Sequence, residues 1–159
     1  MKSLRTLRVV VGGVPGSFRA ARDAAGVRVA VGVLAASGWA LLVALARSRG
    51  RPRLRNALRH FTWSAWLTAR YGTALADAVT SEHELHSLDP LDSEADQRNN
   101  QAGRRYGRVH RDRVLERPGP WAIWELAEIG RRRWYAGRLW SVRDGAVVAG
   151  GRPQGRRTS

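Results

Sequence analysis

The pattern of apolar and polar positions divides the chain into one unbroken apolar run and a longer amphipathic region. Residues 29–46 read VAVGVLAASGWALLVALA without a charge, and Arg28 and Arg47 flank them. A helix of about 18 residues is just long enough to cross the hydrocarbon core of a bilayer, so the run predicts a membrane span or an export signal. A buried core helix is the alternative that this pattern leaves open.

Apolar residues then recur at helical spacing in four segments. The first runs from about Pro52 or Leu54 to Arg70, the second from Thr73 to Leu85, the third from Ser93 to Gly107 or His110, and the fourth from Pro120 to Gly137. We expect Ser93 to cap the third helix in a capping box with Asp96. Gly103 and Gly107 on its inner face allow another helix to approach closely.

Two short apolar runs at 139–142 and 146–149 follow, separated by Arg143-Asp144-Gly145, and they predict a hairpin. The predicted fold class is therefore mainly all-α, with about four helices and a short C-terminal β-hairpin, preceded by one hydrophobic helix.

The same pattern suggests five consecutive parts of the chain. They are a basic leader at 1–28, the hydrophobic segment at 29–46, a basic linker at 47–55, a helical domain at 56–149 and a disordered basic tail at 150–159. Glycine and proline allow at most a short helix in the leader, from about Ser17 to Ala25. Arg111 to Pro120 is expected to be a charged link.

Charge narrows the choice of partner. The chain has 28 Lys and Arg against 13 Asp and Glu, a net charge of +15 that attracts phosphate in nucleic acid or in anionic lipid. Five arginines at alternate positions from 47 to 55 directly follow the apolar run, where a polybasic stretch usually meets lipid head groups. We therefore expect a membrane partner with anionic head groups, and a membrane-bound or exported protein rather than a cytoplasmic one. No nucleic-acid motif is present, so nucleic acid is not expected.

Polar residues at helical spacing mark three segments of the predicted helical domain. They are Asn56, Arg59, His60 and Trp63 in the first, His83 and Glu84 in the second, and Asp96, Asn99, Asn100 and Arg104 in the third. Buried polar groups need partners, and Asn and Asp are poor residues for a helix interior. The pattern therefore predicts a polar site where the first three helices meet.

Two kinds of chemistry fit these residue types. With a divalent metal such as zinc, His60, His83 and Asp96 would supply three ligands and leave a position for a nucleophilic water. Without a metal, His60 or His83 would act as general base, oriented by Glu84 or Asp96, while Arg59 or Arg104 stabilises an oxyanion or phosphate.

Both versions predict a hydrolase-like activity on a phosphate-containing or ester substrate. The remaining four residues, Asn56, Trp63, Asn99 and Asn100, are assigned to binding. The alternative is a non-enzymatic, membrane-associated interaction module whose polar cluster only fixes the packing of the helices.

The polar segments also form a recognisable motif. N-A-L-R-H-F-T-W from Asn56 to Trp63, then His83-Glu84, then D-x-x-N-N-x-x-G-R from Asp96 to Arg104 resembles an uncharacterised family of bacterial domains. Members of that family are often found in secreted or toxin-like proteins. The resemblance runs from Leu54 to Val142, implies that the same polar residues form the site, and implies no particular activity.

Overall fold

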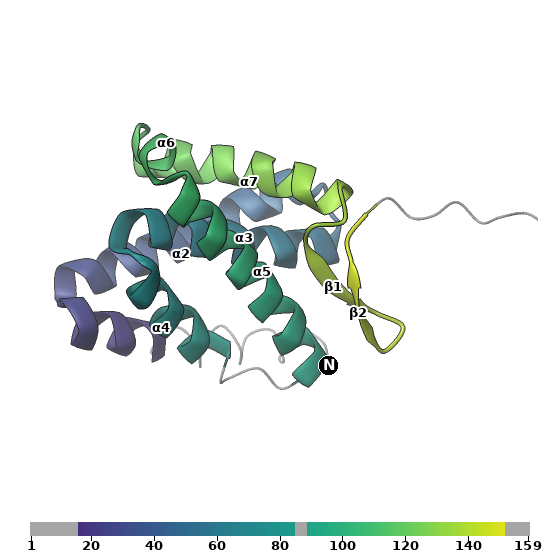
Figure 1. Cartoon of the computed structure of the whole chain (residues 1–159), viewed down its shortest axis with the longest axis horizontal. Helices are drawn as coiled ribbons and strands as arrows, with labels where there is room; N and C mark the ends of the chain where they lie inside the picture. The colour runs from purple at the N-terminus through teal and green to yellow at the C-terminus, as the bar shows by residue number, and fades with distance from the viewer. Residues whose placement is uncertain (1–15, 85–88, 152–159) are drawn as a thin grey trace, which may run out of the picture.

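The computed structural model describes residues 16–84 and 89–151, except for the side chains of His83 and Glu84. Helical residues 16–25 are followed by α2 (Val27–Ser48), α3 (Pro52–Tyr71), α4 (Thr73–Glu84), α5 (Pro90–Val109), α6 (Arg111–Leu115), α7 (Gly119–Tyr135), β1 (Trp140–Arg143) and β2 (Ala146–Ala149). The predicted fold class is confirmed: a mainly helical protein with one apolar N-terminal helix and a C-terminal hairpin (Figure 1). The first half of the leader, the last residue of the second predicted helix and residues 152–159 of the basic tail lie outside the described residues.

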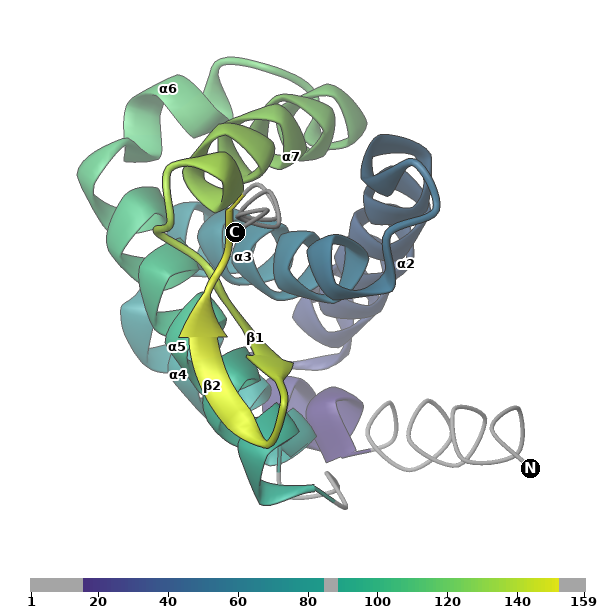
Figure 2. The same cartoon turned by 90° about the vertical axis from the view of Figure 1, so that its right-hand side faces the viewer.

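Helix α3 lies at the centre of the bundle and is covered by α2, α5 and α7 on different sides (Figure 2). Leu58, Phe61 and Ala65 belong to a core shared with α5, α6 and α7, whereas Trp63 and Leu67 belong to a second core shared with α2 and α4. A helix buried on several sides must satisfy every polar group it carries, so the polar residues of α3 need partners on its neighbours.

Helices α3 and α5 pack with their backbones almost in contact. A Cβ atom at Gly103 would collide with the carbonyl oxygen of Phe61, and one at Gly107 would collide with the carbonyl oxygen of Ala65. The two glycines, one turn apart on α5, therefore set the distance between the two helices that carry most of the candidate site residues.

The start of α5 differs from the prediction. Asp89 is the N-cap, its carboxylate accepts a hydrogen bond of 2.9 Å from the Leu91 backbone N–H, and Pro90 occupies the first helical position. The predicted capping box at Ser93 and Asp96 is therefore wrong. An Asp-Pro pair satisfies the helix start one turn earlier, because proline at that position needs no hydrogen-bond acceptor. Asp96 is left in the helix interior, facing α3.

Two further elements refine the prediction for the C-terminal third. The expected charged link contains the short helix α6, and Val114 of that helix is buried in the core. The hairpin forms as predicted, with Trp140 paired to Ala149 and Arg143 to Ala146. Its turn residues Asp144 and Gly145 have φ of 51° and 73°, the left-handed pair that two-residue hairpins require.

Helix α2 has two different faces. By length and composition it could cross a membrane, and it is the only such helix in the described part of the chain. Its small residues Ala30, Ala36 and Ala40 are buried against α3 and α7, whereas its large residues on the opposite face are exposed. At its C-terminal end, Arg47 contacts Glu128 of α7 at 2.6 Å. The hydrogen bond from Arg131, with the charges of Arg47 and Arg132, lowers the pKa of the Glu128 carboxyl.

Candidate functional site

A buried polar cluster joins the middle of α3 to the first half of α5. His60 on α3 is 1% exposed, and its Nε2 atom lies 3.1 Å from Oδ2 of Asp96 on α5. Asn56, one turn before His60, donates from Nδ2 to the other carboxylate oxygen, Oδ1, at 2.6 Å. Both oxygens of Asp96 are therefore held by side chains of α3.

The other imidazole nitrogen faces the next turn of α5. His60 Nδ1 lies 3.3 Å from Oδ1 of Asn100, and the Ser64 hydroxyl donates to the same oxygen at 2.7 Å. Because an amide oxygen can only accept, Nδ1 carries the proton of this hydrogen bond. Ser64 lies one turn beyond His60 on α3 and was missed in the sequence, although its spacing from Asn56 and His60 places it on the same helical face.

Arg59 adds a positive charge beside the imidazole. Its Nη2 atom lies 2.6 Å from His60 Nε2 and 3.4 Å from Oδ1 of Asn56. Nε2 has either a lone pair, which accepts from Arg59, or a proton, which it donates to Asp96. Nε2 therefore has a guanidinium donor on one side and a carboxylate on the other. In both states the ring nitrogens contact protein groups, and the ring is almost completely buried.

Three predicted site residues serve other contacts. Asn99 accepts from the Trp140 backbone N–H and donates to its carbonyl oxygen, each at 2.9 Å, and so attaches β1 to α5. Arg104 contacts Thr80 at 2.8 Å and Asp77 at 2.9 Å, which joins α5 to α4.

The Trp63 indole N–H donates to the Val33 carbonyl oxygen at 3.4 Å and its ring lies in the core beneath α2. The side chains of His83 and Glu84 lie outside the described residues.

The double hydrogen bond between Asn99 and β1 gives a direct prediction. Asn99→Ala should lower the free energy of unfolding by about 1 to 3 kcal/mol, because it removes the partner of the partly buried N–H and carbonyl groups of Trp140. Chemical denaturation would measure the loss, and amide exchange should accelerate in both hairpin strands. Gln97→Ala, an exposed amide two residues earlier on the same helix, is the control and should change the unfolding free energy by no more than about 0.5 kcal/mol.

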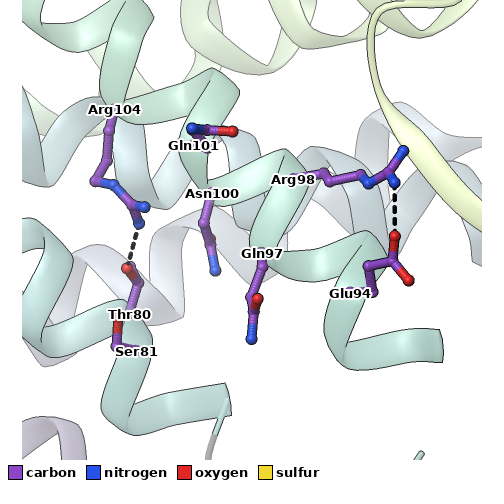
Figure 3. A pocket seen from close by; sticks show the side chains of 8 residues that line it. All are labelled: Thr80, Ser81, Glu94, Gln97, Arg98, Asn100, Gln101 and Arg104. Carbon is purple, nitrogen blue, oxygen red and sulfur yellow. Dashed lines mark hydrogen bonds and ion pairs between the residues drawn. The ribbon is translucent and has the colours of Figure 1, made fainter. Parts of the chain in front are cut away.

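A cleft of about 470 Å³ lies beside the cluster, between α4 and α5 (Figure 3). Thr80, Gln97, Gln101 and Arg104 are among its lining residues, and Arg104 spans it to reach the Thr80 hydroxyl (Figure 3). Asn100 also lines the cleft, and its oxygen contacts His60, so this residue links the buried cluster to the cleft.

The structure describes only part of the predicted metal site. Among residues 16–82 and 89–151, no group of three or more His, Asp or Glu side chains is arranged to hold a metal ion. The predicted ligand set of His60, His83 and Asp96 includes one side chain outside that description. The described pair, His60 and Asp96, is already engaged with Arg59, Asn56 and Asn100.

The fold and the cluster define a small helical domain with a buried histidine, carboxylate and amide network at its central helix pair. Residues 45–117 match the family model described as a domain of unknown function, DUF6973. This match covers somewhat less than half of the chain, includes α3, α4, α5 and α6, and agrees with the predicted resemblance to an uncharacterised domain family. Comparisons with curated proteins and with solved structures gave no significant match.

Proposed function

We propose that the protein is a non-enzymatic module that binds the surface of an anionic membrane through the outer face of α2. The observation that carries this proposal is the division of α2 into two apolar faces. The inner face belongs to the core, so the helix is fixed to the domain. The outer face presents large side chains to solvent: Val27 (59% exposed), Val31 (57%), Trp39 (45%), Leu42 (58%) and Leu45 (44%). An apolar face of this kind is typical of an interaction site.

Helix α7 extends this surface with two tryptophans. Trp121 is 66% exposed and Trp124 is 40% exposed, near the start of the helix that packs against α2. The guanidinium of Arg47 lies 4.5 Å from the centre of the Trp124 ring, which places this tryptophan beside the end of α2. Tryptophan favours the boundary between head groups and acyl chains, so these positions suit a membrane surface.

Basic residues favour lipid over a protein partner for this face. Arg28 lies at the N-terminal end of the outer face, and four exposed arginines follow this face, namely Arg49, Arg51, Arg53 and Arg55. Each basic residue close to an anionic bilayer contributes about 1 kcal/mol of attraction. An apolar face between arginines matches the layered chemistry of an anionic membrane, with acyl chains inside and phosphates outside.

The packing of α2 supports binding in the plane of the membrane rather than a full span. Its inner face shares a core with Trp63, Leu67 and Ile123. A spanning α2 would have to leave these residues exposed, or draw α3 and α7 into the hydrocarbon together with charges such as Glu128. Both alternatives cost several kcal/mol, whereas an interfacial position keeps the core intact.

Vesicle binding by the full chain tests this proposal. The protein should sediment with vesicles of phosphatidylcholine and phosphatidylserine, weakly or not at all with phosphatidylcholine alone, and less as salt is added. Tryptophan fluorescence should shift to shorter wavelength on binding. An alkaline wash should release the protein from membranes, because α2 would lie in the plane of the bilayer and not cross it. Failure to bind anionic vesicles at low salt would refute the proposal, and retention after the wash would favour a span.

A second candidate function is hydrolysis of a phosphate or carboxylic ester, and the convergence of His60, Asp96 and Arg59 beside a cleft supports it. The substrate would have to enter from the cleft, pass Asn100 and displace Arg59 from Nε2 of His60. Purified protein should then hydrolyse a model ester, and His60→Gln should abolish turnover while circular dichroism shows an unchanged fold. Equal turnover in the variant would remove this candidate and leave the cluster as a structural link between α3 and α5.

A further inference from the structure

A second hollow, of about 440 Å³, lies between α5, the C-terminal end of α7 and the start of β1. Four arginines line it, namely Arg98, Arg105, Arg133 and Arg138, together with His110. None of the described residues that line it is acidic. We call this hollow the arginine groove.

Most of the charge of the arginine groove is not balanced by ion pairs among the described residues. Carboxylates of the described residues pair with arginines elsewhere: Glu125 with Arg113, Glu128 with Arg131 and Asp77 with Arg104. Of the groove arginines, Arg98 pairs with Glu94, one turn before it on α5 (Figure 3). Within residues 16–82 and 89–151, no carboxylate side chain lies within ion-pair distance of Arg105, Arg133 or Arg138. Three guanidinium groups around one hollow therefore lack a negative charge, which an anionic ligand would supply.

Arg133 is held in place by aromatic rings. Its guanidinium carbon lies 5.2 Å from the centre of the Tyr106 ring and 5.6 Å from that of Phe61. Burial, and then the charge of Arg138, lowers the pKa of the Arg133 guanidinium. These surroundings disfavour the charged form of the Arg133 guanidinium, and an anion beside it would offset that cost. A fixed, partly desolvated arginine also binds an anion with little loss of side-chain entropy.

Aromatic side chains give the groove a second kind of surface. Tyr106 and Trp140 line it beside the arginines, and the Tyr106 ring centre lies 4.3 Å from that of His110. The volume is that of a site for a small molecule rather than a single ion. A ligand with a phosphate at one end and a planar ring at the other would match both surfaces.

We infer that the arginine groove binds a phosphate-bearing small molecule of nucleotide size. Its phosphate would lie between Arg105, Arg133 and Arg138, and its ring would lie against Tyr106 and Trp140. This site goes beyond the proposed membrane function, because α5 and α2 lie on different sides of α3 (Figure 2). A phosphate in the groove would therefore come from a soluble molecule and not from the bilayer that contacts α2.

Calorimetric titration of the full chain with adenosine monophosphate, inorganic phosphate and adenosine tests the inference. Adenosine monophosphate should bind most tightly, inorganic phosphate more weakly, and adenosine without measurable heat. Arg105→Gln and Arg133→Gln should each weaken binding of adenosine monophosphate by about tenfold or more. Because Arg105 is exposed, Arg105→Gln should leave the fold intact. It therefore measures the loss of binding even if Arg133→Gln disturbs packing. Arg108→Gln, an exposed arginine on the same helix outside the groove, is the matched control and should bind as the wild type does.

Five results would overturn the inference. Adenosine could bind as tightly as adenosine monophosphate, or none of the three probes could bind. Arg108→Gln could weaken binding as much as Arg105→Gln does, which would indicate only the general positive field. A single-stranded oligonucleotide could bind through Arg105 without competition from adenosine monophosphate, which would indicate a nucleic-acid surface. Finally, adenosine monophosphate could release the protein from phosphatidylserine vesicles, which would indicate that the groove holds lipid head groups.

Discussion

A variant with both Leu42→Glu and Leu45→Glu is expected to bind anionic vesicles at least about 100-fold more weakly than the wild type. The two leucines are 58% and 44% exposed on the outer face of α2. Fully burying an exposed leucine side chain contributes about 1.5 to 3 kcal/mol. Because only about half of each of these side chains is still exposed, losing both removes about 1.5 to 3 kcal/mol in total. Two negative charges facing phosphatidylserine weaken the attraction further. Sedimentation with vesicles over a range of lipid concentrations would measure the change.

Val109→Glu is the matched control for this double variant. Val109 on α5 is 65% exposed, comparable with Leu42, but it is not part of the α2 surface. Its substitution should leave vesicle binding within about twofold of the wild type, apart from the effect of one charge. Thermal melting should show that both variants remain folded, because exposed side chains contribute little to stability. Unchanged binding by the double variant would eliminate α2 as the membrane contact.

Helix α2 has one buried face and one exposed face, and the sequence predicted the helix but not which face is buried. An uncharged run of this length predicts a hydrophobic helix, and the structure confirms one. Membrane spans and core helices share that composition, so length alone does not separate them. The sizes of the side chains carry more information. Small residues recur on the face that packs against α3 and α7, and large residues such as Trp39 and Leu42 recur on the other face. Only the neighbouring helices show which of the two faces is covered.

The polar cluster was predictable as a set of residue types but not as a set of contacts. Polar residues at helical spacing indicated that α3 and α5 face each other, and the structure places His60 beside Asp96 and Asn100. Neighbouring positions on a helix differ in direction by about 100°. Asn100 therefore contacts α3 while Asn99 contacts β1. The sequence pattern does not show which element packs against each face of α5. The start of α5 was predicted at the wrong residue because two kinds of helix cap, a capping box at Ser93 and an Asp-Pro cap at Asp89, both fit the local sequence.

The contacts of the cluster depend on the close approach of α3 and α5, so a single methyl group at Gly107 should have the largest effect on stability. Gly107→Ala is expected to lower the free energy of unfolding by about 2 kcal/mol or more. The new Cβ would collide with the backbone carbonyl of Ala65, which cannot move aside as a side chain could. Separating the helices would also lengthen the contacts from His60 to Asp96 and Asn100, whose buried groups would then lose partners. The helix propensity of alanine favours the variant by about 1 kcal/mol and only partly offsets these losses.

Gly38→Ala provides the same chemical change without the collision. Nothing lies within 4 Å of a Cβ atom at Gly38, which is exposed in the middle of α2. This variant should be as stable as the wild type or more stable by up to about 1 kcal/mol, because only the propensity term applies. Urea denaturation of both variants separates packing from propensity, since both replace glycine with alanine inside a helix. If Gly107→Ala were as stable as Gly38→Ala, the two helices would not be in backbone contact, and the distances that define the polar cluster would no longer hold.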